Sequence, residues 1–454
     1  MNNSLESKQQ QMLTAPVEKL ILKLAAPSIV IMLITALYNL ADTYFVSGLG
    51  TSATAAIGVV FSLMGVIQAV GFFFGNGSGN YISRKLGANE FDKAETMAST
   101  GFFLSLTIGT ILAVLGNIFL EPLCRLLGAS DTMLPYAMGY TRWILIATPF
   151  MTASLTLNNQ LRFLASANMA MYGMVTGALM NICLDPLLIY TLNLGASGAG
   201  LSTCISQICG FCILLWATTR EGNIKMKFSN FNPTTDRFKE IARGGSPSLI
   251  RQICNSLGIL VFNHAAGVFG DQAVAAISIV QRVSAFSISA LLGFGQGFQP
   301  VCGFNYGAKR YDRVIKGFWF CARLITVLLT ALAVLAAIFA PDIIALFRAD
   351  DAQVIAIGTV ALRFQCMTLP FMGLVVLFNM MLQTIGAAKQ ANIIAVSRSG
   401  FFLIPSILLL VAAFGLTGLE VAQTSADVLT LALTLPIGFG VINKMKRAFV
   451  TAKE

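Results

Sequence analysis

The chain alternates between long apolar runs and short polar breaks. A helix needs about 20 apolar residues to cross the hydrocarbon core of a bilayer, and each run is long enough to do so. We count twelve runs, at positions 20–46, 54–81, 96–120, 134–160, 169–192, 198–219, 246–269, 273–302, 318–340, 353–384, 392–413 and 419–442. The pattern therefore predicts an all-α integral membrane protein with twelve transmembrane helices.

The prolines, glycines and loops that interrupt these runs repeat at an offset of 220 residues. Pro27-Ser28 recurs as Pro247-Ser248, and the loop that begins Gly87-Ala88 recurs as Gly307-Ala308. Repeated bundles in membranes are typical of transporters, with the substrate site between the repeats. Because each half holds six runs, both halves take the same orientation, and a pseudo-twofold axis along the membrane normal should relate them.

The longest polar stretch separates the two halves. It runs over 220–245, and Asn230, Asn232 and Pro233 within it favour turns. We therefore expect an N-terminal six-helix bundle over 1–219, a cytoplasmic linker over 220–245 and a C-terminal six-helix bundle over 246–454.

Composition agrees with a membrane protein. Of the 454 residues, 56% are hydrophobic and only 11% are charged, with a mean hydropathy of +0.76. A soluble domain has about a quarter of its residues charged, so lipid must cover this chain.

The net charge of +10 reflects topology rather than nucleic-acid binding. Of the 30 Lys and Arg residues, 22 lie on the side of the N-terminus, 21 of them in breaks and Lys23 at the start of the first run, whereas Arg125 and Arg348 lie in the opposite breaks. The positive-inside rule then places both termini in the cytoplasm. We expect a multi-pass protein of the cytoplasmic (inner) membrane that binds no nucleic acid.

Three carboxylic acids interrupt the apolar runs: Asp42, Asp185 and Asp427. A charge at the centre of a span costs about 2.5–3.5 kcal/mol on insertion scales, so such acids are usually functional. Asn181 lies four residues before Asp185 and shares its helix face, and Thr203 in the sixth span adds a hydroxyl. These residues predict a polar site that binds and releases a proton. Local hydrogen bonding or hydration near an interface is the alternative, and Asp427 shows no partner in its own span.

The C-terminal half carries arginines in its spans. Arg251, Arg323 and Arg398 lie near cytoplasmic ends and are expected to snorkel toward water. Arg282, about nine residues into its span, is expected to pair with a carboxylate or carbonyl group. The sequence holds no catalytic or metal-ligand motif, so we expect neither an enzyme nor a cofactor.

Three motifs resemble those of the multidrug and toxic compound extrusion (MATE) family, in the prokaryotic branch similar to DinF and MepA. They are Tyr38-Asn39-x-x-Asp42-Thr43, the Gly-Ala loops after the second and eighth spans, and Asn181-x-x-x-Asp185-Pro186. The resemblance covers essentially the whole chain. It implies a V-shaped pair of bundles that exports organic cations in exchange for protons or sodium ions.

The resemblance also implies a cation- or proton-coupling site in the N-terminal bundle, formed by Asp42, Asn181, Asp185 and Thr203. Asn39, Arg282 and Asp427 are secondary candidates. One branch of the family carries an acid eight residues after the proline of the seventh span, where this chain has Asn255. This departure shifts coupling toward the N-terminal acids, with protons favoured over sodium ions.

The function that we predict is a secondary antiporter that exports organic cations or drugs by alternating access, as a monomer within the lipid bilayer. The alternative is a flippase for a lipid-linked precursor, whose phosphate would meet Arg251, Arg282 and Arg363. A membrane scaffold or receptor is a third class, but the chain has no sizeable soluble segment to support it.

Overall fold

The computed structural model describes residues 2–348 and 351–451, apart from a few side chains. Its N-terminal bundle consists of long helices, one of which, α7, continues into the short π-helical turn η1. Their bounds are α2 (Val17–Ser47), α3 (Thr51–Gly87), α4 (Phe91–Ile118), α6 (Leu134–Phe163), α7 (Ala167–Pro186), η1 (Leu187–Thr191) and α8 (Gly195–Thr218).

The C-terminal bundle has the same plan. Its helices are α9 (Thr235–Gly267), α10 (Asp271–Gly307), α11 (Tyr311–Ile338), α13 (Ala352–Thr384), α14 (Ala388–Val396), η3 (Ser397–Phe401) and α15 (Leu403–Thr451). Gly415 has non-helical dihedral angles and divides α15 into two helices. The first part of α15 continues α14 and η3, and the second part forms the last long helix.

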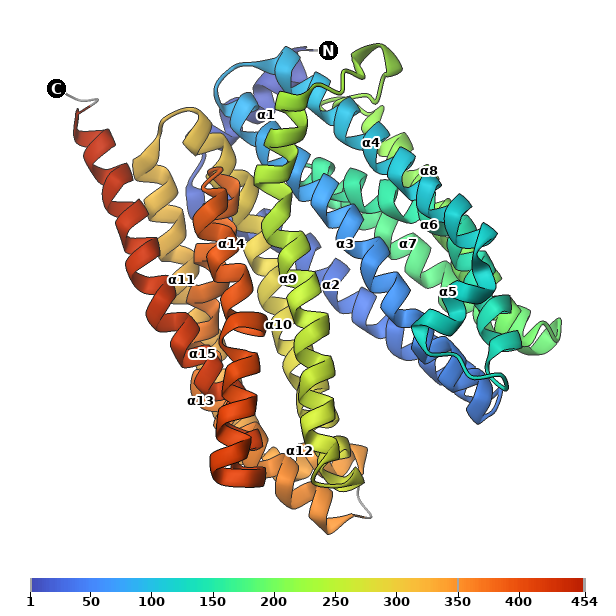
Figure 1. Cartoon of the computed structure of the whole chain (residues 1–454). Helices are drawn as coiled ribbons and strands as arrows, with labels where there is room; N and C mark the ends of the chain where they lie inside the picture. Colours follow the sequence, from blue (N-terminus) through green and yellow to red (C-terminus); the bar gives the residue numbers. More distant parts are fainter. Residues whose placement is uncertain (1, 349–350, 452–454) are drawn as a thin grey trace.

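The described residues thus form twelve long helices that correspond to the twelve predicted spans, as Figure 1 lets the reader trace. Within the described part of the chain, nine ranges are long and apolar enough to cross a membrane by length and hydropathy alone, and the last of them, Ala388–Thr451, contains two helices. The two remaining helices, α6 and α9, carry more polar residues along their length. The predicted all-α fold is confirmed.

The segment between the bundles is shorter than predicted. The expected linker covered 220–245, but α9 already begins at Thr235, where the side chain of Thr234 caps it by accepting a hydrogen bond from the Arg237 backbone N–H. Only a 3-10 turn, η2 (Phe228–Asn230), interrupts the chain before α9. Polar residues at the start of α9 therefore belong to a helix that extends beyond the apolar part of its span. The domain limits themselves stay a prediction.

The duplication is visible in the helix boundaries. The bounds of α3 and α10 differ by 220 residues at both ends (51 to 271, 87 to 307), and so do those of α4 and α11 (91 to 311, 118 to 338). Two short connecting helices follow the same offset, α5 (Leu120–Leu127) and α12 (Ala340–Phe347). The repeat in the sequence is therefore a repeat of structure.

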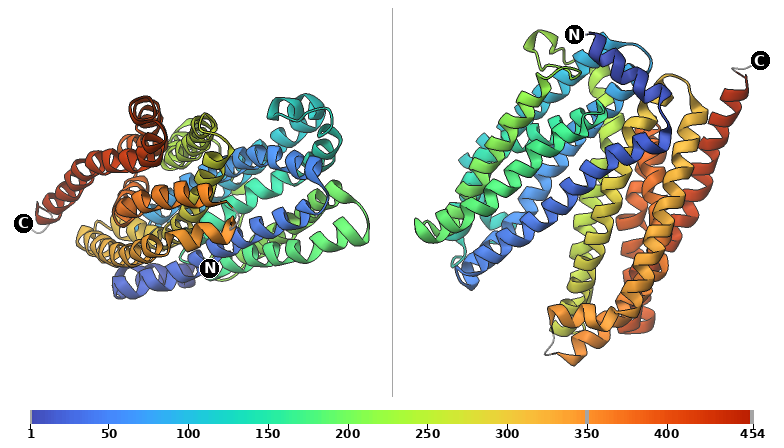
Figure 2. Two further views of the ribbon diagram at one scale, coloured as in Figure 1. Left: turned by 90° about the horizontal axis from the view of Figure 1, so that it is seen from below. Right: turned by 180° about the vertical axis from the view of Figure 1, so that it is seen from behind.

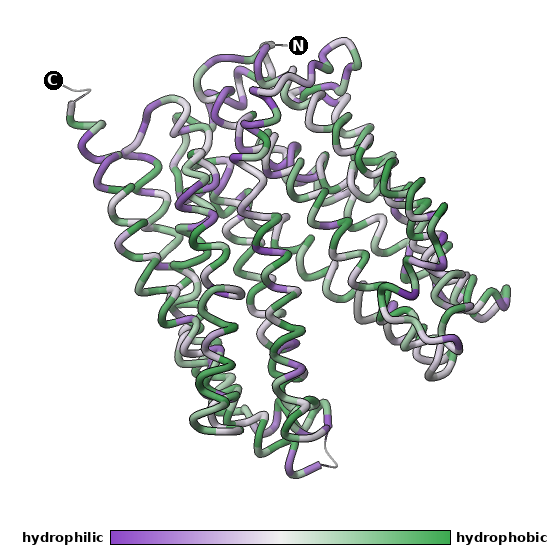
Figure 3. The backbone as a smooth tube through the Cα atoms, viewed as in Figure 1, coloured by the Kyte–Doolittle hydropathy of each residue, from purple (hydrophilic) through white to green (hydrophobic). Residues whose placement is uncertain are grey.

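The two bundles form a V. They lie together at the end where α1 and the end of α15 lie, and they spread apart toward α5 and α12 (Figures 1 and 2). Hydrophobic residues follow the helices, and hydrophilic residues gather at the end with the termini (Figure 3). Val114 and Leu115 on α4, like their counterparts Val334 and Leu335 on α11, are exposed, as expected for side chains that face lipid.

Contacts between the bundles concentrate at the closed end of the V. Helix α3 packs against α9, and α2 packs against α10. Arg84 on α3 donates a hydrogen bond to the Thr384 carbonyl at 2.6 Å and forms an ion pair with Glu240 at 3.3 Å. A Cβ atom on Gly87 or Gly307 would overlap a backbone carbonyl oxygen of the opposite helix, so glycine at both positions permits this close approach.

A short helix that the sequence analysis did not predict crosses this closed end. Helix α1 (Asn2–Thr14) contacts the N-terminal bundle through Lys8, whose ammonium group donates to Ser166, Gly222 and Asn223. Its last residues receive hydrogen bonds from the C-terminal bundle, where Arg310 donates to the Leu13 carbonyl at 2.9 Å. Helix α1 therefore touches both halves of the molecule.

Candidate functional site

The motif Asn181-x-x-x-Asp185-Pro186 occupies the end of α7, where Pro186 is followed by the π-helical turn η1. Asn181 and Asp185 are buried, and both face α8. With the amide of Asn181 assigned so that both of its ends are satisfied, its nitrogen donates to Asp185 Oδ2 at 3.1 Å. Asn181 therefore fixes the position of the Asp185 carboxyl group within the N-terminal bundle.

Helix α8 completes this arrangement with two consecutive hydroxyl residues. The side-chain oxygen of Asn181 accepts hydrogen bonds from the Ser202 hydroxyl at 3.1 Å and from the Thr203 backbone N–H at 3.3 Å. Ser202 and Thr203 are fully buried. The two helices can approach because glycines face each other between them, including Gly173, Gly177 and Gly210.

Asp42 on α2 is the second acid of this site. Its residue is 1% exposed, and its charge interacts with that of Asp185. The aromatic rings of Tyr38 and Tyr140 lie nearby, with both hydroxyl groups close to Thr203. Among the described residues, none donates a hydrogen bond to Asp42 Oδ1. A buried carboxylate oxygen without a donor is costly, so a proton or a cation bound there would stabilise it.

The structure thus brings together the four residues named for the coupling site: Asp42, Asn181, Asp185 and Thr203. Their role stays a prediction. The side chain of Asn39, a secondary candidate, lies outside the described part of the structure.

The expectation for Arg282 is not met in the described structure. Its side chain is exposed on α10, and none of the hydrogen bonds or ion pairs among the described residues involves it. The expected pairing with a carboxylate or carbonyl is therefore wrong. Arg282 lies on the outer surface of the helix, whereas its neighbours Gln281 and Ser284 point inward.

Asp427 has hydrogen-bond partners, although the sequence of its own span showed none. Its carboxylate accepts hydrogen bonds from Arg398 Nε at 3.1 Å, from Gln423 at 3.0 Å and from Thr368 at 3.3 Å. Gln423 is one helical turn earlier on α15, and Arg398 comes from η3. The prediction that Arg398 snorkels is therefore wrong, because its guanidinium neutralises a buried acid inside the C-terminal bundle.

Arg251 also points inward rather than along the helix to water. Its guanidinium donates to Asn379 Oδ1 on α13 at 3.3 Å and lines a cavity between the helices of the C-terminal bundle. Pro247 lies one helical turn before it within α9. The expected snorkelling of Arg251 is likewise wrong.

The sequence analysis missed a polar network that joins the two bundles. Arg162 on α6 is buried and donates to Asn159 Oδ1 at 2.5 Å and to Asn76 Oδ1 at 3.2 Å. Asn76 in turn donates to Ser248 on α9, which also accepts from Gln383 on α13. The sequence signal for this network is the run of consecutive amides Asn158, Asn159 and Gln160 in an otherwise apolar span.

Comparison with known proteins agrees with this architecture. The MatE family model matches residues 27–187 and 247–409, and its two matches begin 220 residues apart. A multidrug export protein MepA from Staphylococcus haemolyticus is 27% identical over 429 residues, which are 94% of this chain and 94% of the relative. A MepA from Staphylococcus aureus is 27% identical over 412 residues, 89% of each chain.

Solved structures resemble the fold closely. One, described as the outward-facing conformation of a multidrug resistance MATE family transporter of the MOP superfamily, has a TM-score of 0.90 and 26% identity. The alignment covers 96% of this chain and 98% of that one. A MATE crystallised in complex with MaL6 has a TM-score of 0.91, also at 26% identity, over 96% of this chain and 99% of that one.

The family match extends over both halves, the helix pattern repeats with the same period, and the solved relatives share the whole fold. The predictions of the family and of a transporter rather than an enzyme are confirmed. This chain belongs to the MATE family of multi-pass membrane transporters.

Proposed function

We propose that this protein is a secondary antiporter that exports organic cations across the cytoplasmic membrane and takes up a coupling ion in exchange. The observation that carries the proposal is the pair of buried acids, Asp42 and Asp185, in a bundle whose outer surface is apolar. Intramembrane acids are expensive to insert and mark ion pathways in transporters. Relatives that match nearly the full length are named multidrug export proteins, which supports drugs as the exported class.

The chemistry of the site bears on which ion is coupled to transport. Two buried carboxylates whose charges interact, one of them with an unpartnered oxygen, would be stabilised by a bound proton. The same oxygens, with the hydroxyls of Ser202 and Thr203, are also the hard ligands that sodium ions take. One branch of the family has an acid at the position of Asn255, and this chain does not. Coupling then depends on the two N-terminal acids, and we favour protons as the coupling ion.

The V shape supports alternating access. Lys and Arg residues gather on the side of the termini, so the closed end of the V faces the cytoplasm by the positive-inside rule, and the spread end faces outward. The relative described as outward-facing has a closely similar fold. Binding of an ion from the outer side would stabilise one arrangement of the two bundles. Binding of cargo would stabilise the opposite arrangement. This difference is sufficient to couple the two fluxes.

Transport by reconstituted protein tests the proposal. Tetraphenylphosphonium, an organic cation that carries no titratable group, is offered to proteoliposomes under an imposed pH gradient and, separately, under a sodium gradient. We expect the pH gradient to drive transport in the wild type. We expect Asp185→Asn to reduce transport to the level of protein-free liposomes, because an amide cannot exchange a proton at neutral pH.

Asp236→Asn is the matched control, since Asp236 is an exposed acid of α9 whose side chain is 94% exposed. It should transport like the wild type. Gradient-driven transport by Asp185→Asn at the wild-type rate would contradict the proposed site. No driven transport of any cation by correctly folded wild type would favour the flippase instead.

A further inference from the structure

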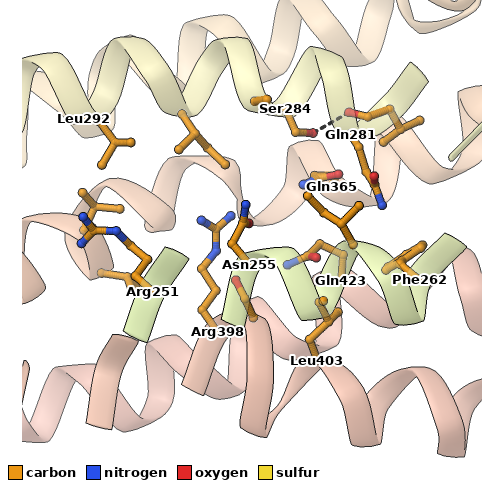
Figure 4. Close-up of a pocket in the computed structure, with 18 of the residues that line it drawn as sticks. Arg251, Asn255, Phe262, Gln281, Ser284, Leu292, Gln365, Arg398, Leu403 and Gln423 are labelled. Carbon is orange, nitrogen blue, oxygen red and sulfur yellow. Dashed lines mark hydrogen bonds between the residues drawn. The ribbon is translucent and has the colours of Figure 1, made fainter. Parts of the chain in front are cut away.

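The C-terminal bundle encloses a cavity of about 320 Å³ that is separate from the acids of the N-terminal bundle. Helices α9, α10, α13 and α15 line it, together with η3 (Figure 4). The volume is at the lower end of the range of drug-binding pockets, which span about 300–1,000 Å³. Its wall combines apolar side chains, including Phe262, Leu292 and Leu403, with several amides, including Gln281 and Gln365. Such a mixture suits an amphipathic small molecule.

Two guanidinium groups enter this cavity, and their surroundings differ. Arg398 is neutralised by Asp427, which is 1% exposed and also bound by Gln423. Arg251 donates to the amide oxygen of Asn379, whose own nitrogen is held by the Ala391 carbonyl at 2.7 Å. Among the described residues, no carboxylate lies within ion-pair distance of Arg251. Figure 4 shows both arginines and Asn255 in the space that faces α10.

An arginine in this position lacks a counter-charge. A guanidinium has five N–H donors in a planar fork that matches a carboxylate, and one neutral amide oxygen uses only one of them. Arg251 is half-buried, and a partly desolvated charge without a counter-charge favours an anionic oxygen group of a ligand there.

The same cavity also holds an acid. Glu420 on α15 lines it and is 9% exposed, and it makes no hydrogen bond or ion pair within the described part of the chain. Glu420 lies about one helical turn beyond Gln423, away from Asp427. In Figure 4, Gln423 lies between Arg398 and Phe262, with Arg251 at the opposite end of the cavity. The cavity therefore offers a cation at one end and an acid toward the other.

We propose that this cavity binds amphipathic zwitterions, whose carboxylate pairs with Arg251 and whose cationic end faces Glu420. This inference rests on the proposed export of organic cations, because it names the class of cargo. If the inference is right, a carboxylate on the cargo strengthens binding. A site lined only by acids would instead bind a simple cation better than a zwitterion.

Rhodamine B and its ethyl ester test this inference by equilibrium binding. Both molecules carry the same delocalised cation and aromatic body, but only rhodamine B has a free carboxylate. Fluorescence anisotropy is measured with the purified full-length protein in nanodiscs, without any gradient. We expect the wild type to bind the acid more tightly than the ester by about tenfold, as one charge-assisted pair predicts.

The variant Arg251→Gln should weaken binding of the acid by about tenfold and leave the ester nearly unchanged, because the ester does not use the guanidinium. Arg251→Lys should retain part of the preference, since it keeps the charge but loses the fork. Arg323→Gln is the matched control, because Arg323 is exposed on α11 and does not line the cavity. Size-exclusion profiles and melting curves report whether each variant folds.

Equal binding of acid and ester by the wild type would overturn the inference, and so would an equal loss of both in a folded Arg251→Gln variant. A lipid phosphate could satisfy the same guanidinium. If the acid binds only in nanodiscs that lack anionic phosphatidylglycerol, Arg251 serves lipid and the inference also fails. Because binding needs no gradient, it can hold while antiport fails, or fail while antiport holds.

Discussion

Buried charges in the C-terminal bundle illustrate how single residues determine stability in a membrane. Asp427 is 1% exposed and Arg398 is 20% exposed at the side chain, and the two meet at 3.1 Å. Removal of one partner leaves an uncompensated charge inside the bundle, which costs more than the pair itself contributes.

We predict that Arg398→Met destabilises the protein by about 3–5 kcal/mol, because the buried Asp427 then loses its counter-charge. The double variant Arg398→Met with Asp427→Leu should recover most of this loss, since it removes both charges. Apparent melting temperatures in detergent, compared across wild type, both single variants and the double variant, measure the effect. A double variant as unstable as Arg398→Met would show that the pair contributes through shape rather than charge.

At this scale the sequence predicted the N-terminal site better than the C-terminal cavity. Asn181 and Asp185 share a face by helical spacing, so their contact was accessible from local periodicity. Arg251 and Arg398 lie near helix ends in the sequence, where water would be the simplest partner. Only the packing of α9, α13 and α15 shows that Asn379 and Asp427 take the place of water.

At the scale of elements, the half-buried Lys8 helps to hold α1 at the closed end of the V. The ammonium group of Lys8 has three oxygen acceptors, in Ser166, Gly222 and Asn223, and no carboxylate among them. Burial lowers the pKa of Lys8 from 10.5 to about 8. In the undocked helix the lysine would regain its ordinary pKa, so the undocked state binds more protons between these two values.

The docking of α1 should therefore tighten as the pH rises from about 8 toward 10.5, and the full penalty for the buried charge should remain below pH 8. Hydrogen exchange of the α1 amides, corrected for intrinsic rates, should show greater protection at about pH 9.5 than at about pH 7. Lys8→Met should abolish this pH dependence, and Lys19→Met, at an exposed position of α2, should keep it. Protection that falls with rising pH would contradict the burial of Lys8.

The long helices were largely predictable, because a run of about 20 consecutive apolar residues usually forms a transmembrane helix. The exceptions have physical causes. Helix α9 starts at Thr235, ahead of its apolar run, because a capped polar turn continues the helix outside the hydrocarbon region. Helix α1 has no apolar core, and its position depends on tertiary contacts with residues as distant as Arg310.

At the scale of the whole molecule, the repeat predicts two similar bundles but does not specify how they meet. The closed end of the V depends on contacts between chain segments hundreds of residues apart, such as Arg84 with Thr384. The network from Arg162 through Asn76 to Ser248 crosses the same interface. These hydrogen bonds join the two bundles, so they stabilise the present arrangement of the V.

Cargo and coupling ion should be linked through Asp42 and Asp185. Linkage is reciprocal, so if protons weaken cargo binding, cargo must release protons. The most direct measurement is proton release from purified protein in a weakly buffered solution when tetraphenylphosphonium is added to saturation. We predict release by the wild type, weaker cation binding at lower pH, and loss of both effects when Asp42 and Asp185 are replaced by Asn. Unchanged proton release in that variant, or cation affinity that depends on neither pH nor sodium ions in the wild type, would contradict coupling through these two acids.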